Sequence, residues 1–185
     1  MLRVGTMYTA VIRLHNLASP LLLAAGALFF AVALSSSWLW QEPAQLDVAY
    51  QKMEVDLKQK ANARRQNAVV HFDLDADFTN SWNWNVKDIY VSVVLSYLSA
   101  PRGQQQAEAS GSKVANSMVI WDTILSSKES AVMKLRDTPS KYPVRHLDGL
   151  LPQGNMSLRV EYSTFPHVGY LYRGSGPLDT FVWTR

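Results

Sequence analysis

Three aspartates at alternating positions are the residues of this chain that most invite a chemical role. If their segment is a β-strand, Asp73, Asp75 and Asp77 leave one face with successive Cβ atoms about 7 Å apart. That spacing is too wide for the three carboxylates to bind one ion without a bend. An EF-hand calcium loop beginning at Asp73 would need Gly and Glu at the positions that Phe78 and Trp84 occupy. The pattern therefore favours a solvated strand face over a metal site.

The sequence carries no local signature of a zinc site or a catalytic nucleophile. Its histidines show neither His-x3-His nor His-Glu-x-x-His spacing; they are His15, His71, His146 and His167. Ser175 lies in the sequence Gly-Ser-Gly-Pro, not in a Gly-x-Ser-x-Gly elbow, and a turn or terminal loop explains it better. The chain contains no cysteine, which excludes thiolate ligands and disulfides. We therefore predict no catalytic residue, no cofactor and no metal ligand.

An uncharged apolar segment precedes the part of the chain that carries these residues. No Asp, Glu, Lys or Arg occurs between Arg13 and Glu42. A bilayer core requires a helix of roughly 20 mostly apolar residues, because lipid offers no hydrogen-bond partner to a free backbone group. Trp38 and Trp40 at the far end are typical of the headgroup zone. Residues 16–38 are therefore predicted to form a single transmembrane helix.

The charges that flank this segment predict its orientation. Basic residues without an acid precede it, and the first charge beyond it is Glu42. The positive-inside rule then places residues 1–15 in the cytosol and residues 39–185 across the membrane. The small residues that end at Ala33 leave a cleaved signal peptide as an alternative. Continuation of the apolar run past Ala33 and the two tryptophans favour a retained anchor.

The charge balance argues against a nucleic-acid partner. The formal net charge is +3, but two of the 18 Lys and Arg residues, Arg3 and Arg13, precede the apolar segment. The remaining 16 are matched by 15 acids. This balance gives no electrostatic basis for binding nucleic acid.

The part beyond the anchor alternates in the manner of short antiparallel strands. Apolar residues occupy every second position from Val70 to Phe78, which predicts a half-buried strand. A more deeply buried strand is expected at residues 89–98 because β-branched and aromatic residues dominate it. Further strands are expected at residues 117–125, 130–137, 155–164 and 168–173, with loops at residues 100–113 and 138–154. Such short strands joined by turns predict an all-β domain, a two-sheet antiparallel β-sandwich.

Residues 46–57 fit two structures. Their apolar positions alternate twice, with a slip in phase between Tyr50 and Met53 that a strand achieves with a bulge. The same positions also follow a helical spacing, so the pattern alone leaves strand and helix open.

Two local features point to a modification and to a partner. Asn155 begins the only N-glycosylation sequon, Asn-Met-Ser. Aromatic enrichment in a turn-rich connection favours a partner contact there, and its candidate residues are Trp82, Asn83, Trp84 and Asn85. Most aromatic residues beyond the anchor, a set that includes Phe165 and Tyr170, are expected in the sandwich core.

The order of these segments resembles the signal peptidase complex subunit 3 family, the non-catalytic glycoprotein subunit of the eukaryotic microsomal signal peptidase. After the anchor, the resemblance rests on FDLDADF (72–78), WNWNVKDIYV (82–91), VIWD (119–122), MKLRD (133–137), NMSLRVEY (155–162) and GSG (174–176). These pieces follow one another in the family's order over nearly the whole chain. The polar residues 100–113 and the ending soon after GSG depart from the family pattern, so the resemblance implies no contacts for them.

The resemblance implies a type II anchor in the endoplasmic reticulum membrane and a lumenal β-sandwich, with a strand at residues 46–57. It implies an accessory role beside a separate catalytic serine protease subunit, and no cofactor. The implied partners are that subunit, the other subunits of the complex, the lipid bilayer and the protein translocon. Asn155 corresponds to the family's glycosylation position.

Two other functions fit the same segments. A membrane-anchored lumenal or surface module that binds glycans or peptides would expose aromatic residues in a groove. A secreted metal-dependent hydrolase would require cleavage after Ala33 and a cation on the face of Asp73, Asp75 and Asp77.

Overall fold

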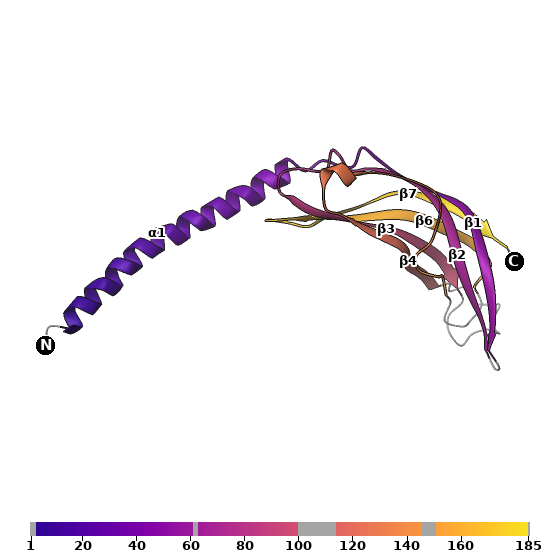
Figure 1. The fold of residues 1–185 in the computed structure, drawn as a ribbon, viewed down its shortest axis with the longest axis horizontal. Coiled ribbons are helices and arrows are strands. Elements are labelled where there is room, and N and C mark those ends of the chain that lie inside the picture. Colours follow the sequence, from indigo (N-terminus) through magenta and orange to yellow (C-terminus); the bar gives the residue numbers. More distant parts are fainter. Residues whose placement is uncertain (1–2, 61–62, 100–113, 146–150, 185) are drawn as a thin grey trace.

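The computed structural model describes residues 3–60, 63–99, 114–145 and 151–184, so the polar loop predicted at residues 100–113 lies outside the described part. One long helix, α1 (Arg3–Trp38), precedes the strands (Figure 1). The strands are β1 (Gln45–Lys60), β2 (Ala63–Asp77), β3 (Val86–Ser99), β4 (Val114–Leu125), β5 (Val132–Pro139), β6 (Gly154–Pro166) and β7 (Tyr172–Trp183). A 3-10 turn, η1 (Lys128–Ser130), precedes β5.

The strands form two antiparallel sheets, ordered β1-β2-β5 and β4-β3-β6-β7. Their inner faces enclose one hydrophobic core. The predicted β-sandwich on a single N-terminal apolar helix is therefore confirmed. The helix leaves one end of the sandwich and carries the N-terminus away from it (Figure 1).

The helix α1 has the length and composition of a membrane span. Val11–Ser35 has a mean hydropathy of 2.3, and none of its most apolar stretch is buried within the chain. An apolar helix that the rest of the chain leaves uncovered requires an apolar solvent around it. The helix begins at Arg3, so much of the predicted tail, residues 1–15, continues the span as helix.

The inward face of β2 supplies the centre of the core, as its alternation predicts. Val70, Phe72 and Leu74 are fully buried, and the residues between them are only half-buried. Opposite them, β3 lies between β4 and β6 and is buried along most of its length, which confirms the more deeply buried strand. Each Phe, Leu or Val side chain removed from water in this way contributes about 1.5–3 kcal/mol.

Strand β1 is a strand and not a helix, and its irregularity falls where the phase of the sequence slips. The pairing of β1 with β2 shifts register between Tyr50 and Lys52. At this bulge the Tyr50 N–H donates to Asp179 Oδ2 of β7 over 2.6 Å. The Tyr50 ring also stacks on Phe181, with 3.7 Å between ring centroids. The bulge therefore fastens an edge strand of one sheet to an edge strand of the other.

The connection that follows β5 joins the two sheets on another side. Its Ser140 N–H donates to the Val70 carbonyl of β2 over 2.8 Å, and its Tyr142 N–H donates to the Ile120 carbonyl of β4 over 3.0 Å. The Tyr142 hydroxyl also donates to Asp122 Oδ1 over 3.1 Å. The Asp of the VIWD segment therefore holds this connection in place.

The C-terminal strand differs from the sequence-based prediction. A strand is predicted at residues 168–173 and a turn or loop around Ser175, whereas β7 begins at Tyr172 and includes the Gly-Ser-Gly-Pro sequence. Both predictions are wrong because neither glycine nor proline is typical of a strand interior. The pairing of β6 with β7 is irregular at this point, where Glu161 opposes Ser175 but Arg159 opposes Leu178. The other predicted strands are present with ends displaced by a few residues.

Two glycines of β7 are required by close contacts with other strands. A Cβ atom on Gly174 would lie 2.6 Å from Cζ of Tyr162, and one on Gly176 would lie 2.5 Å from the carbonyl oxygen of Leu46. Neither distance is compatible with a side chain. Gly174 thus makes room for the Tyr162 ring of β6, and Gly176 makes room for the backbone of β1.

We expect Gly174→Ala to lower the free energy of unfolding by about 1–3 kcal/mol, because the added methyl group displaces the Tyr162 ring. The matched control is Ser175→Ala, an exposed neighbour, which should change it by less than about 0.5 kcal/mol. Urea denaturation of the full-length chain in detergent, followed by tryptophan fluorescence, measures both. Equal stability of the two variants would contradict the steric role of Gly174.

Candidate functional site

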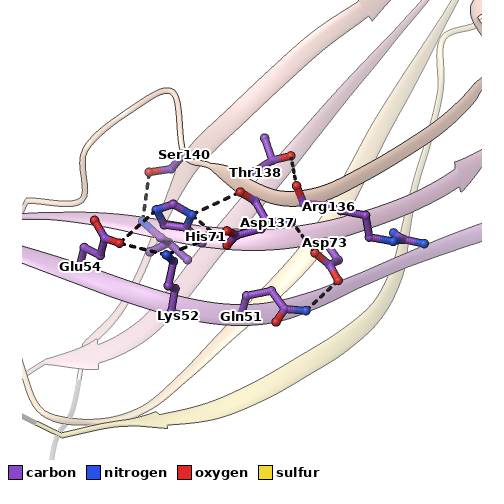
Figure 2. A network of polar contacts seen from close by, with 10 residues as sticks. Gln51, Lys52, Glu54, His71, Asp73, Arg136, Asp137, Thr138 and Ser140 are labelled. Carbon is purple, nitrogen blue, oxygen red and sulfur yellow. Dashed lines mark hydrogen bonds and ion pairs between the residues drawn. The ribbon is translucent and has the colours of Figure 1, made fainter.

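The three aspartates lie on the outer face of β2, where protein groups engage them. Asp75 accepts two hydrogen bonds from Nη2 of Arg136 on β5, at 2.8 and 2.9 Å. Asp73 accepts hydrogen bonds from Nε2 of Gln51 on β1 at 2.7 Å and from the Asp137 N–H on β5 at 2.8 Å (Figure 2). These carboxylates therefore link the three strands of their sheet.

A histidine completes this polar network. Nδ1 of His71 lies 3.1 Å from Oδ1 of Asp137, and its Nε2 lies 3.8 Å from Oε1 of Glu54 (Figure 2). The Asp137 backbone has a positive φ of 44°, a left-handed conformation that Asp tolerates better than most residues. Among the described residues, no group of three or more His, Cys, Asp or Glu side chains could hold a metal ion.

The remaining candidates for chemistry lie on separate elements. His15 is on α1, His167 follows β6, and Ser175 is exposed on β7. His146 lies outside the described residues.

The connection between β2 and β3 begins with a turn that Asp77 stabilises. The Thr79 N–H donates to Asp77 Oδ1 over 2.8 Å, and hydrogen bonds from Thr79 lower the pKa of the Asp77 carboxyl. Beyond this turn, Trp82 is half-buried and packs against the core, whereas 61% of Trp84 is exposed. The assignment of residues 82–85 to a partner contact stays a prediction, and Trp84 is its most accessible side chain.

The two asparagines of the same connection bond to backbone groups. Oδ1 of Asn83 accepts the Asn85 N–H over 2.9 Å. Asn85 is almost fully buried; its Nδ2 donates to the Val168 carbonyl over 2.6 Å, and its Oδ1 accepts the Val168 N–H over 3.1 Å. Asn85 thus ties the β2–β3 connection to the β6–β7 connection.

An aromatic stack holds the link that follows α1 against the sandwich. The Trp40 ring lies parallel to Tyr172 of β7, with 4.5 Å between centroids and 3° between planes, and 6.4 Å from the ring of Tyr162. Tyr162 in turn contacts the core residue Phe78 edge-on at 5.5 Å. Burial raises the pKa of Tyr162, and the Glu42 charge raises it further. Trp40, which the sequence pattern assigns to the headgroup zone, therefore packs its ring against the sandwich.

A hydrogen bond supports this junction. The Tyr172 hydroxyl donates to Oγ of Ser37, in the last turn of α1, over 2.8 Å. Ser37 Oγ also bonds to the Ala33 carbonyl over 3.2 Å, so that the hydroxyl has partners within the helix and across the junction. Stacking and hydrogen bonding together set the direction in which α1 leaves the sandwich.

A groove lies between α1 and the tips of the two connections. One wall is a single helical face, because its residues follow the i, i+3, i+4, i+7 spacing. The lining residues are Ala25, Leu28, Phe29 and Val32 from α1, with Trp84, Asn85, His167 and Val168 from the tips. The sandwich therefore reaches back along the apolar helix.

Some aromatic residues on the two tips beside this groove are exposed. Tyr97, Trp121 and Tyr162 are buried as expected, but 74% of Tyr170 and 41% of Phe165 are exposed. Phe165 and Tyr170 are thus among the aromatic residues that the core does not take up.

The sequon lies at the other end of the sandwich. Asn155 is exposed near the start of β6, whereas the tips beside α1 follow the end of that strand. A strand rises about 3.3 Å per residue, which separates Asn155 from Pro166 by roughly 35 Å. The asparagine side chain is therefore accessible and remote from the helix junction.

In the described part of the chain, one apolar helix of membrane-spanning length precedes an antiparallel β-sandwich and contacts it, which is typical of a membrane-anchored β-sandwich protein. Within that class, residues 7–182 match the family described as "Signal peptidase subunit". The chain belongs to this family.

Curated relatives named "Signal peptidase complex subunit 3" are similar to the chain. The Schizosaccharomyces pombe protein is 32% identical over 119 residues, 63% of this chain and 58% of that protein. The Debaryomyces hansenii protein is 32% identical over 129 residues, 66% of this chain and 63% of that protein. The Gallus gallus protein is 29% identical over 130 residues, 66% of each. The chain thus spans somewhat less than two thirds of the length of the two yeast proteins.

We expect Trp40→Ala to loosen the junction, because an aromatic pair contributes about 0.5–1.5 kcal/mol beyond its burial. Backbone amides near residue 40 should then exchange with deuterium up to roughly tenfold faster. Hydrogen exchange of the full-length chain in detergent, read by mass spectrometry, measures this. The control is Trp84→Ala, which leaves the stack intact. Unchanged exchange in the Trp40 variant would show that the stack does not hold the junction.

Proposed function

We propose that this protein is a non-catalytic accessory subunit of the endoplasmic reticulum signal peptidase complex, which removes signal peptides from nascent secretory proteins. The family match over residues 7–182 carries the proposal. The curated relatives bear the name of subunit 3 of that complex. The proposed partners are the catalytic serine protease subunit, the other subunits of the complex and, beside them, the translocon.

The proposed topology is a single-pass type II anchor, with residues 1–15 cytosolic, residues 16–38 in the membrane and residues 39–185 in the lumen. The basic residues before α1 and the acid Glu42 after it support this orientation. The groove that residues 25–32 of α1 form with the two tips supports a retained helix, because cleavage after Ala33 would remove these residues from the sandwich.

The proposed contribution of this subunit is positional. Trp40 and Tyr172 couple the direction of the helix to that of the sandwich, so the sandwich stands at a set height and tilt above the bilayer. A partner domain bound to the sandwich would inherit that placement. Misplacement of a catalytic group by about 1 Å can cost on the order of a hundredfold in rate. A scaffold with no reactive groups of its own can therefore control the rate of a neighbouring enzyme.

The polar clusters of the sandwich fit this role. Asp73 and Asp75 bond to neighbouring strands, and Asp122 holds the connection after β5. These three aspartates thus contribute to the shape of the domain.

The test is purification of the tagged full-length chain from membranes in a mild detergent, with partners identified by mass spectrometry. We expect recovery at equal stoichiometry with a serine protease subunit, and cleavage of a signal-peptide substrate by the eluate. Recovery as a stable, inactive monomer would overturn the proposal and favour a membrane-anchored module that binds glycans or peptides.

Two variants separate positioning from assembly in the same experiment. Trp40→Ala should retain the protease subunit but slow cleavage, because it loosens the junction without altering the outer faces of the sheets. Trp84→Ala tests the predicted partner contact, since 61% of Trp84 is exposed. Loss of the protease subunit from the Trp84 variant would assign residues 82–85 to the subunit interface.

Glycosylation provides an independent test of the topology. We expect the chain expressed in cells to migrate faster on a denaturing gel after treatment with a glycosidase that removes N-linked glycans. The Asn155→Gln variant should migrate at this faster position before treatment. The reason is that Asn155 is exposed and would lie in the compartment where glycans are transferred. A second sequon engineered at residues 1–15 should stay unmodified. Modification of that engineered sequon would reverse the proposed orientation.

A further inference from the structure

Three uncharged stretches of the sequence meet at one place in the fold. Besides residues 14–41, no Asp, Glu, Lys or Arg occurs between Asp77 and Lys87 or between Glu161 and Arg173. The second and third stretches form the tips of the β2–β3 and β6–β7 connections. Both tips line the groove against α1. Loops in water usually carry charge, so this coincidence requires an explanation.

Four exposed side chains of these tips are apolar or aromatic, beside the exposed polar residues Asn80 and His167. Trp84, Tyr170, Phe165 and Leu171 have 61, 74, 41 and 38% of their surface exposed. Trp and Tyr are the residues enriched at membrane–water interfaces, where a ring is buried while its N–H or O–H stays hydrated.

The groove fixes the depth of the tips relative to the helix. Its wall extends from Val32 to Ala25, and Ser35 ends the candidate span. At 1.5 Å per residue, these positions lie roughly 5–15 Å inside that end. The 25 residues of the span exceed a hydrocarbon core of roughly 30 Å by about 7 Å. Even if all of this excess projects beside the sandwich, the deeper part of the groove remains within the hydrocarbon.

Several backbone polar groups of the tips already have hydrogen-bond partners within the protein. A free N–H or carbonyl group is costly near hydrocarbon, because lipid offers no partner. Asn85 satisfies both backbone groups of Val168 through its side chain, and the His167 N–H donates to the Asn85 carbonyl over 2.7 Å. The Val86 N–H donates to the Asn83 carbonyl over 3.0 Å. The buried asparagine thus supplies partners that water supplies to an ordinary loop.

We propose that residues 82–85 and 165–171 insert into the leaflet on the sandwich side of the membrane, with lipid acyl chains filling the groove beside α1. The polar residues Asn83 and His167 keep the insertion shallow, at the boundary between headgroups and acyl chains. Lipid is the occupant that the structure favours, because the helical wall of the groove is itself part of the membrane span. The inference requires only that α1 crosses a bilayer and is independent of any peptidase.

The absence of cysteine from the chain allows a direct test. Trp84→Cys and Tyr170→Cys, labelled with a fluorophore sensitive to polarity, place a probe on each tip. Ser117→Cys is the control, because Ser117 is exposed on β4 and pairs with Ser96, roughly 30 Å along β3 from Val86. Each full-length variant is reconstituted in phosphatidylcholine vesicles. Two quenchers are compared in separate measurements. One is a nitroxide attached near the headgroup end of the lipid acyl chain, and the other is iodide dissolved in the water.

We expect the lipid nitroxide to quench the probes at positions 84 and 170, with blue-shifted emission, and iodide to quench only the probe at position 117. Quenching of both tip probes by iodide, to the same extent as the control, would overturn the proposal. It would also be overturned if the tip probes become shielded only in the complex isolated from membranes, since a protein partner would then cover them. Circular dichroism of each variant confirms that the sandwich is folded.

Discussion

The contact between Trp40 and Tyr172 holds the water-exposed sandwich against the end of the apolar helix. An apolar helix and a water-exposed sandwich share no core, and only residues 39–44 link them along the chain. Without side-chain contacts, that link would let the sandwich pivot over the membrane. The stack of Trp40 on Tyr172 restrains the link after α1. The ring of Tyr162 connects this stack to Phe78 in the core. Gly174 is part of the same arrangement, since any side chain there would displace Tyr162.

The sequence predicts those parts of the fold that depend on neighbours along the chain. The alternation of β2 and the apolar helix are local patterns, and both are confirmed, whereas the pattern of residues 46–57 leaves strand and helix open. The junction is not predictable in this way because Trp40 meets residues more than a hundred positions away. The glycines of β7 predict a turn and not a strand for the same reason, because their small size makes room for residues of β6 and β1 that are distant in sequence. The exposure of Phe165 and Tyr170 is not predictable either, because the aromatic character of a residue favours burial without saying which members of a set are buried.

The residues that look most reactive turn out to define shape. Asp73, Asp75 and Asp137 hold the outer face of one sheet together, and Asp122 ties a long connection to the other sheet. Two lateral fastenings, at the β1 bulge and after β5, then join the sheets. Polar residues used in this way restrict how the domain can deform. Such stiffness suits a protein whose proposed task is to hold another in position.

The hydrogen bond between Ser37 and Tyr172 joins residues 135 positions apart, and this separation has a consequence for biosynthesis. The helix is synthesised before the strand that orients it. Until β7 emerges from the ribosome, the sandwich lacks an edge strand, and the direction of α1 relative to the sandwich is not fixed. Contacts of such long range are slow to form, because the chain between them must be ordered first. The direction of α1 relative to the sandwich is therefore set only after β7 has been synthesised, and a chain truncated before β7 would keep the apolar helix without the strand that orients it.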